Sequence, residues 1–273
     1  MLNNLRRLSA AISSGSALRF SSYRVAHSYS HATSLRAFHT LESPKNRRTR
    51  PSIIIETNGI SILVDTSPDI RTQLLASNIE TVDAVLYTHV HYDHIGGIGE
   101  LRTLSFLAKH RIDIYVTFAT LDTLKKNWSY LFKSDTSDDA KLYKPVAEAH
   151  PFEYGAPFNV QGIEILPFEM DHGICDTTGF RVGNFAYSTD VVELNDNAFE
   201  KLQGVETWVV DCLREEPHPT HSHLERTLEW IERVSPSRAI LTHMNFQTDY
   251  QKIKALCPEG VEPGFDGMVL EID

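Results

Sequence analysis

The sequence predicts an α/β (α+β) protein in which two mixed β-sheets pack face to face, with helices on their outer faces. Short apolar runs typical of buried strands alternate with helical patterns along the chain. Asn58-Gly59, a strong two-residue hairpin signal, separates two strand-like runs at 52–57 and 60–65. Because hairpins and strand–helix units are mixed, a simple doubly wound parallel sheet is excluded.

The further elements follow from the same two periodicities. Runs that are apolar or rich in β-branched and aromatic residues predict strands at 83–87, 112–116, 163–170, 178–183, 184–188, 208–211, 239–242 and 268–272. Apolar residues at helical spacing, such as Ile98, Leu101 and Leu104, predict helices at 69–77, 97–110, 121–132, 199–202, 221–234 and 248–256. Residues 133–161 are more polar and indicate a mixed connection.

Length and composition bound the class of protein. The 273 residues suffice for one large domain, and 41% hydrophobic and 23% charged residues are ordinary for a soluble globular protein. No apolar run approaches the length that spans a bilayer. Cys175, Cys212 and Cys257 match neither a disulfide framework nor a zinc knuckle, so we expect three buried thiols under intracellular, reducing conditions.

The charge is divided unequally along the chain. Nine of the 26 Lys and Arg residues but only one of the 36 acids lie in residues 1–50, so this segment carries about +8 and the rest of the chain about −18, which sum to the net charge of −10. Residues 1–43 are rich in Ser and Arg, and a leucine stripe near Met1 suits one helical face. This composition predicts a disordered organellar targeting leader over 1–43, mitochondrial rather than secretory, with a plastid or cytoplasmic location as alternatives. The folded domain is then expected at 44–273.

The most informative stretch places three histidines and an aspartate within six residues: His89, His91, Asp93 and His94. It follows the apolar run 84–87, and a loop at the end of a buried strand can aim several side chains at one point. Imidazole suits zinc and similar metals, and a carboxylate adds charge. Four ligands this close together are too dense for one ion, so the motif predicts a pair of metals.

Three later residues supply what such a pair still lacks: His172, Asp190 and His243. Each of them follows an apolar run, at 163–168, 185–187 and 239–241. A lone histidine near a strand end is more often a satisfied core or surface residue than a ligand. As a set beside the first motif, however, the three predict the remaining ligands of a two-metal site.

The order His-x-His-x-Asp-His, followed by His, Asp and His, resembles that of metallo-β-lactamase-fold hydrolases. The resemblance implies an αββα metallo-β-lactamase sandwich with the ligands on loops along one edge. It assigns one metal to His89, His91 and His172 and the other to Asp93, His94 and His243, with Asp190 as the bridge. The C-terminal part is similar to the branch of bacterial phosphoribosyl cyclic phosphodiesterases, through Asp211, 217–221, 240–243 and 264–268. The likeness runs from about 45 to 273.

The cofactors expected from these residues are two divalent metal ions, Zn²⁺ first, with Mn²⁺ or Fe²⁺ as alternatives. Two such ions can share a bridging hydroxide, a strong nucleophile at neutral pH. Asp93 would ligate one ion and orient that nucleophile. Asp65 ends a strand beside the site, where it either supports a ligand imidazole or caps the turn at 66–68.

A general acid has to come from elsewhere, and His221 is the candidate, with His218 and His223 as rivals. His221 precedes a helical run at 224–234, whose N-terminus can hold an anionic phosphate. A solvated, His-rich turn is the alternative. Arg214 could pair with phosphate, but a surface role is favoured for it.

These residues predict a two-metal-dependent hydrolase, a phosphodiesterase acting on a small, cyclic phosphodiester. A glyoxalase-II-type thioester hydrolase is an alternative, although the chain lacks a separate basic, helical substrate domain. A transfer-RNA 3′-end endonuclease would need a basic RNA-clamping arm, and an acidic body disfavours long nucleic acid. A non-catalytic scaffold with the same fold is a further alternative. Intact ligands argue against it, because a scaffold need not retain all seven. A small-molecule substrate, no membrane span and a homodimer are compatible with the sequence.

One departure from the branch concerns its first strand. Its members usually begin with a strand and a Gly-rich loop before the segment that corresponds here to 44–48, where this chain has the predicted leader. Three explanations stay open: an edge strand is missing, the start joins a wrong exon, or residues 30–43 take its place. A missing strand would leave a ladder of unpaired backbone groups.

Overall fold

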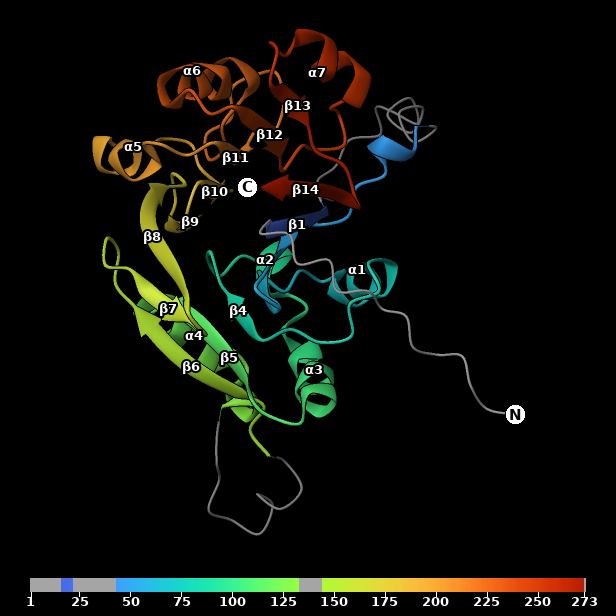
Figure 1. Ribbon diagram of the computed structural model, residues 1–273, viewed down its shortest axis with the longest axis vertical. Coiled ribbons are helices and arrows are strands. Elements are labelled where there is room, and N and C mark those ends of the chain that lie inside the picture. The colour runs from blue at the N-terminus through green and yellow to red at the C-terminus, as the bar shows by residue number, and fades with distance from the viewer. Residues whose placement is uncertain (1–15, 22–42, 133–143, 273) are drawn as a thin grey trace.

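The computed structural model describes residues 16–21, 43–132 and 144–272 and has two seven-stranded sheets (Figure 1). The first has the order β14-β1-β2-β3-β4-β5-β6 and the second the order β13-β12-β11-β10-β9-β8-β7. The first sheet is built from β1 (Ser16–Ser21), β2 (Ser52–Thr57), β3 (Ile60–Val64), β4 (Ala84–Leu86), β5 (Ile112–Thr117), β6 (Ala147–Phe152) and β14 (Met268–Ile272). The second is built from β7 (Phe158–Val160), β8 (Ile163–Asp171), β9 (Asp176–Val182), β10 (Phe185–Ser188), β11 (Thr207–Asp211), β12 (Arg238–Thr242) and β13 (Val261–Pro263).

Helices cover the outer face of each sheet (Figure 1). The first sheet is accompanied by α1 (Ile70–Ala76), α2 (Tyr92–Ile95), α3 (Leu101–Ala108) and α4 (Phe118–Asn127). The second is accompanied by α5 (Asp196–Leu202), α6 (Leu224–Val234) and α7 (Tyr250–Leu256). Both sheets are mixed, since antiparallel and parallel pairings occur in each. The predicted αββα sandwich is therefore confirmed. No helix in the described parts of the chain is both long and apolar enough to cross a bilayer.

Strands with apolar side chains on both faces build the three core layers. In β3, Ile62 and Val64 face the second sheet, whereas Leu63 packs under the helices of the first. In β11, Val209 joins the layer between the sheets and Trp208 the layer under α5 and α6. Side chains alternate across a strand, so an uninterrupted apolar run is the pattern of a strand that is covered on both sides.

The hairpin between β2 and β3 forms as predicted, with Asn58 (φ 51°) and Gly59 (φ 81°) as its two turn residues. Positive φ at both positions is typical of a type I′ turn, whose twist matches that of the flanking strands. Register is thereby set, and Ile55 pairs with Ile62.

The interpretation of residues 133–161 as a mixed connection is wrong for its second half, because β6 and β7 lie there. Among the described residues β6 pairs with β5 alone and is an edge strand, and it contains Pro151. An edge strand tolerates proline and polar residues, since one side of its backbone has no ladder to complete. Its sequence therefore lacks the continuous apolar run by which the buried strands were predicted.

β1 comes from within the predicted leader. Ser16–Ser21 pair antiparallel with both β2 and β14, so the expected disorder does not extend to these six residues. The first strand that the resemblance leads one to expect is thus supplied by 16–21, which lie between β14 and β2 in the sheet. The rest of the leader, 1–15 and 22–42, lies outside the described residues, and the division at residue 43 stays a prediction.

The segment after the leader is fastened to the C-terminal motif at 264–268. The backbone N–H and the hydroxyl of Thr49 both donate to Oδ2 of Asp266, at 3.1 and 2.9 Å. Asn46 is buried, donates to Asp249 at 2.7 Å and accepts from the backbone N–H of Tyr250. The motif therefore joins the segment before β2 to the segment before β14.

Asp266→Ala is expected to lower the free energy of unfolding by about 1–3 kcal/mol, because two partly buried donors of Thr49 lose their acceptor. Chemical denaturation measures the change. Glu271→Ala, on the exposed face of β14, is the control and should stay within about 0.5 kcal/mol of the parent. Equal stability of the two variants would contradict this role for Asp266.

Candidate metal centre

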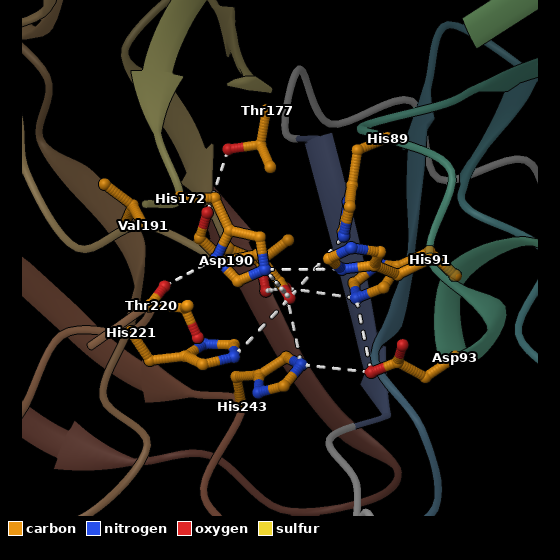
Figure 2. A network of polar contacts seen from close by, with 12 residues as sticks. His89, His91, Asp93, His172, Thr177, Asp190, Val191, Thr220, His221 and His243 are labelled. Atoms are coloured by element: carbon orange, nitrogen blue, oxygen red, sulfur yellow. Dashed lines mark hydrogen bonds and ion pairs between the residues drawn. The ribbon is translucent and has the colours of Figure 1, made fainter. Parts of the chain in front are cut away.

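Every predicted metal ligand follows the C-terminal end of a strand, and the three such strands of the second sheet point the same way. β4 precedes His89, β8 precedes His172, β10 precedes Asp190 and β12 precedes His243. β10, β11 and β12 are parallel, and β8 runs with them because β9 is antiparallel to both of its neighbours. The two sheets therefore bring their ligand loops together at one edge of the sandwich (Figure 2).

The seven residues form two groups whose potential ligand atoms lie within 4.8 Å of one another. One group consists of His89, His91, His172 and Asp190, and the other of Asp93, His94, Asp190 and His243. Asp190 belongs to both. Each group could hold one metal ion, with three or four nitrogen and oxygen ligands as such ions require.

Asp190 turns one carboxylate oxygen toward each group. Oδ1 lies 3.7 Å from Nε2 of both His89 and His172. Oδ2 lies 3.0 Å from Nε2 of His94 and 3.3 Å from Nε2 of His243. Asp93 belongs to the second group only, and its Oδ2 lies 3.5 Å from Nε2 of His243 (Figure 2). This is the arrangement that a carboxylate bridge between two ions needs.

Hydrogen bonds on the outer side fix how the imidazoles present their nitrogens. Nδ1 of His94 donates to Asp65 at 2.7 Å, and Nδ1 of His172 donates to the carbonyl of Thr220 at 2.5 Å. The hydroxyl of Thr88 donates to Asp65, so its oxygen accepts from Nδ1 of His89 at 3.0 Å. Each of these three rings therefore carries its proton outward and turns the Nε2 lone pair inward, as metal binding requires.

Several ring nitrogens of the cluster lack hydrogen-bond partners. Nε2 of His89, Nε2 of His94 and both ring nitrogens of His243 are buried and make no hydrogen bond in the described parts of the chain. Burial without a partner costs free energy unless something else occupies those lone pairs. These orphaned atoms and the His-rich donor set fit a pair of divalent ions.

Burial and mutual charge strongly shift the pKa values in this cluster. Burial alone would raise the pKa of Asp190, but the charges of His243 and His94 outweigh it and hold that pKa well below its usual range. The pKa of His243 is raised to about 9, because the carboxylates of Asp190 and Asp93 overcome the opposing effect of burial. Metal binding must displace protons from these rings, so folding, charge and metal uptake are coupled here.

The backbone is also unusual at three of these positions. Asp65, Asp190 and His243 have φ of 63°, 57° and 59°, a region that non-glycine residues seldom adopt. Each directly follows a strand or stands two residues beyond it, and the left-handed turn redirects the side chain into the site. Thr177 holds one such turn by donating to the carbonyl of Asp190 at 2.9 Å. Conformations of this kind persist where their surroundings impose them.

Asp65 is completely buried and supports the ligand loop rather than capping the turn at 66–68. Its carboxylate accepts from the backbone and the hydroxyl of Thr88 and from His94. Asp65→Ala should therefore weaken metal binding by about 10–100-fold, measured by chelator competition with zinc or manganese. Asp113→Ala is the matched control, since Asp113 also bonds a histidine, His150, but on the exposed side of β5 and β6. Unchanged metal affinity in Asp65→Ala would reject the supporting role.

His221 lies beside the two groups, on a loop between β11 and α6. Its Nε2 is 3.9 Å from Oδ1 of Asp190 (Figure 2). Its Nδ1 is 3.1 Å from Oδ2 of Asp211. Asp211 is fully buried and also accepts from the backbone N–H groups of Val191 and Ser222. Sequence reasoning named Asp211 only as part of a motif, because nothing in the spacing of 211 and 221 predicts that they pair.

The loop that carries His221 packs closely on the turn after His172. A Cβ at Gly173 (φ 81°) would stand 2.7 Å from the carbonyl oxygen of Pro219, so only glycine allows this approach. α6 begins at Leu224, as the helical run at 224–234 predicted, so His221 lies three residues before the helix, and anion binding at this N-terminus stays a prediction. Arg214, for which a surface role was favoured, donates to the carbonyls of Glu216 and Pro217 and so braces the loop.

The two rival histidines take different places. His218 lies with its ring centroid 5.3 Å from that of His221, and burial lowers its pKa to about 4, assisted by the charges of His221 and Arg214. His223 is the N-cap residue of α6, and burial with nearby Arg226 lowers its pKa. In the described parts of the chain no hydrogen bond, ion pair or ring contact joins His223 to the seven clustered residues, so it is not brought to the centre.

Comparison with known proteins places the whole site inside one family. The family described as Beta-lactamase superfamily domain matches residues 61–244, a span that contains all seven clustered residues. An octanoyltransferase of Porphyromonas gingivalis is 30% identical over 85% of this chain and 46% of its own length. The anti-Pycsar protein Apyc1 of Bacillus phage BSP38 is 27% identical over 70% of this chain and 80% of its own. The chain spans about half the length of several such relatives, including a ribonuclease Z of Methanopyrus kandleri at 46%.

Solved structures agree on the fold. A diphosphatase from the PhnP family superposes with a TM-score of 0.82 at 29% identity, over 94% of this chain and 97% of that one. Zinc-bound PqqB from Methylobacterium extorquens, at 17% identity, superposes with a TM-score of 0.72 over 93% and 99% of the two chains. The family match, together with the clustered histidines and aspartates, leads to one conclusion: the chain belongs to the metallo-β-lactamase superfamily of metal-dependent hydrolases.

Proposed function

We propose that this protein is a two-metal phosphodiesterase acting on a small, cyclic phosphodiester. The observation that carries the proposal is the pair formed by His221 and buried Asp211 beside Asp190. A phosphodiester with an alkoxide leaving group needs a proton donor, because an alkoxide is a poor leaving group. The phosphate released when a diphosphate is cleaved is a better leaving group. A histidine held by Asp211 at this place therefore favours a diester substrate over the diphosphate that the name of the PhnP-family diphosphatase implies.

The chain's own residues have separate roles in this proposal. His89, His91, His172, Asp93, His94, His243 and Asp190 would hold two divalent ions, which supply an activated water and neutralise phosphoryl charge when bound. Zn²⁺ suits a site with five imidazoles, with Mn²⁺ or Fe²⁺ as alternatives. The side chain of Asp93 is 21% exposed, so its second oxygen can accept a hydrogen bond from the attacking water.

His221 donates the proton to the leaving oxygen. Asp211 faces Nδ1 of His221 from a fully buried position and stabilises the doubly protonated ring. Nε2, on the opposite side of the ring, then carries the proton that is transferred. Asp211 thus acts as a positioning residue. The net negative charge of the residues after position 50 disfavours binding of long nucleic acid.

Substrate profiling of metal-reconstituted protein tests the proposal. The panel is bis-p-nitrophenyl phosphate, cyclic nucleotides, a diphosphate ester and an octanoyl thioester, run alongside metal analysis of the same preparation. We expect about two metal ions per chain and the highest kcat/KM on a cyclic phosphodiester. Bound metal with no phosphodiester turnover would overturn the substrate class, and absence of metal after reconstitution would overturn the catalytic proposal.

A second candidate is hydrolysis of an acyl thioester, the alternative from the sequence. It is favoured by the similarity to an octanoyltransferase over 85% of this chain. Two exposed apolar side chains adjoin ligands, Tyr92 between His91 and Asp93, and Ile174 two residues after His172. Such residues suit an acyl chain at the mouth of the site. In the same panel, turnover of the octanoyl thioester alone would favour this candidate.

A mitochondrial location is also proposed for the protein, on the basis of the basic, Ser-rich composition of residues 1–43. A reporter fused behind residues 1–43 is expected to enter mitochondria, as seen by microscopy and fractionation. Replacing Arg6 and Arg7 with glutamate should reduce import, because it removes positive charge beside the leucine stripe. A cytosolic signal from the unaltered fusion would reject targeting, and a chloroplast signal would move the address to plastids.

A further inference from the structure

We propose that His218 is a neutral hydrogen-bond donor that binds a phosphoryl oxygen of the substrate through Nε2–H. This rests on the proposed phosphoryl substrate and separates two histidines that the sequence left as rivals, His218 and His221. The inference comes from three observations: which nitrogen of His218 is already occupied, where the loop holds its ring, and what the other nitrogen lacks.

The first observation fixes the tautomer. The backbone N–H of Thr220 donates to Nδ1 of His218 at 3.4 Å, and the hydroxyl of Thr220 lies 3.2 Å from the same nitrogen. A backbone amide can only donate, so Nδ1 must offer its lone pair. The proton of the neutral ring is therefore on Nε2. His221 differs in this respect, because its Nδ1 faces a carboxylate and not a donor.

The second observation places the ring beside the metal centre. The carbonyl of Thr220 accepts from Nδ1 of His172, so the residue that orders His218 is itself fastened to a proposed metal ligand. The close approach of Pro219 to Gly173 holds the same loop from the other side. The ring centroid of His218 lies 5.3 Å from that of His221, and the ring centroid of His221 lies 4.7 Å from those of both His172 and His243.

The third observation concerns the remaining nitrogen. In the described parts of the chain, Nε2 of His218 takes part in no hydrogen bond or ion pair, and the residue is partly exposed. A donor with a fixed tautomer, a held ring and no acceptor in the protein is suited to an oxygen that arrives with the substrate. It cannot serve well as the proton donor, since losing the proton from Nε2 would leave an anionic imidazolate.

Substitution of His218 by glutamine separates two roles, donation of a hydrogen bond and transfer of a proton. The amide of His218→Gln can donate from nearly the same place as Nε2 but cannot transfer a proton. Calorimetry with inorganic phosphate on the metal-loaded full chain is the binding assay. His218→Ala should weaken phosphate binding by roughly 10-fold, as loss of one hydrogen bond to a charged group predicts. His218→Gln should stay within about 3-fold of the parent, and His150→Ala on β6 should leave binding unchanged.

Nitrogen NMR of ¹⁵N-histidine-labelled, metal-loaded protein supplies a readout that needs no turnover. We expect the His218 ring as the neutral Nε2–H tautomer throughout pH 6–8. An Nδ1–H tautomer, or equal phosphate affinity of His218→Ala and the parent, would overturn the inference. Failure of the phosphodiester assays together with the expected NMR and phosphate results would remove the substrate class and leave the role of His218 as an oxyanion donor in place.

Discussion

Asp190→Ala is expected to remove part of the bound metal and to lower hydrolysis by about 10³-fold. The carboxylate turns Oδ1 toward His89 and His172 and Oδ2 toward His94 and His243, so its loss affects both metal positions together. No other described residue belongs to both of the four-residue groups. Metal content by elemental analysis and kcat/KM on a cyclic phosphodiester measure the two effects.

Two companion variants make this result specific. Asp190→Asn keeps the volume of the side chain but removes its charge, so it should also lose metal if the bridge is electrostatic. Asp196→Ala removes an aspartate whose side chain is 91% exposed on α5, and it should retain full metal and rate. Full metal and rate in Asp190→Ala would show that the two groups do not share this residue as a bridge.

His221→Ala should slow hydrolysis of a cyclic phosphodiester by about 10²–10⁴-fold and keep its metals. Hydrolysis of bis-p-nitrophenyl phosphate should slow much less, because p-nitrophenolate leaves without a proton whereas a ribose alkoxide does not. Steady-state rates on the two substrates, measured with the same metal-loaded preparations, give the ratio. His150→Ala is the matched control, since that histidine pairs with Asp113 on the exposed side of the first sheet.

The other outcomes for His221 have distinct meanings. Equal losses on both substrates would assign His221 to phosphate binding or structural support. No loss on either would return it to a solvated turn and reject His221 as the proton donor. Asp211→Asn should reproduce the leaving-group dependence of His221→Ala in weaker form, because Asp211 acts through the ring it orients. A shifted pH profile with metals retained would separate this from simple unfolding.

Local patterns predicted most of the fold because most strands here are covered on both faces. A run such as 84–87 is apolar throughout, since Val85 packs under the helices and Leu86 between the sheets. β6 escaped prediction for the opposite reason: it is an edge strand with exposed positions and a proline. β1 escaped because its composition is that of the basic leader, and only pairing with β2 and β14 gives it a place.

The sequence by itself determined which residues could be ligands and in what order, and it predicted a pair of metals. Metal coordination requires particular atoms, and few residue types carry them, so His89, His172 and Asp190 can be named without coordinates. Only the tertiary structure decided that each oxygen of Asp190 faces a different group, that Asp211 holds His221 and that Thr220 orders both His172 and His218. Those relations join residues from different strands and loops, such as His172 and Thr220, 48 positions apart. Such contacts arise from packing of the two sheets and leave no local periodicity in the chain.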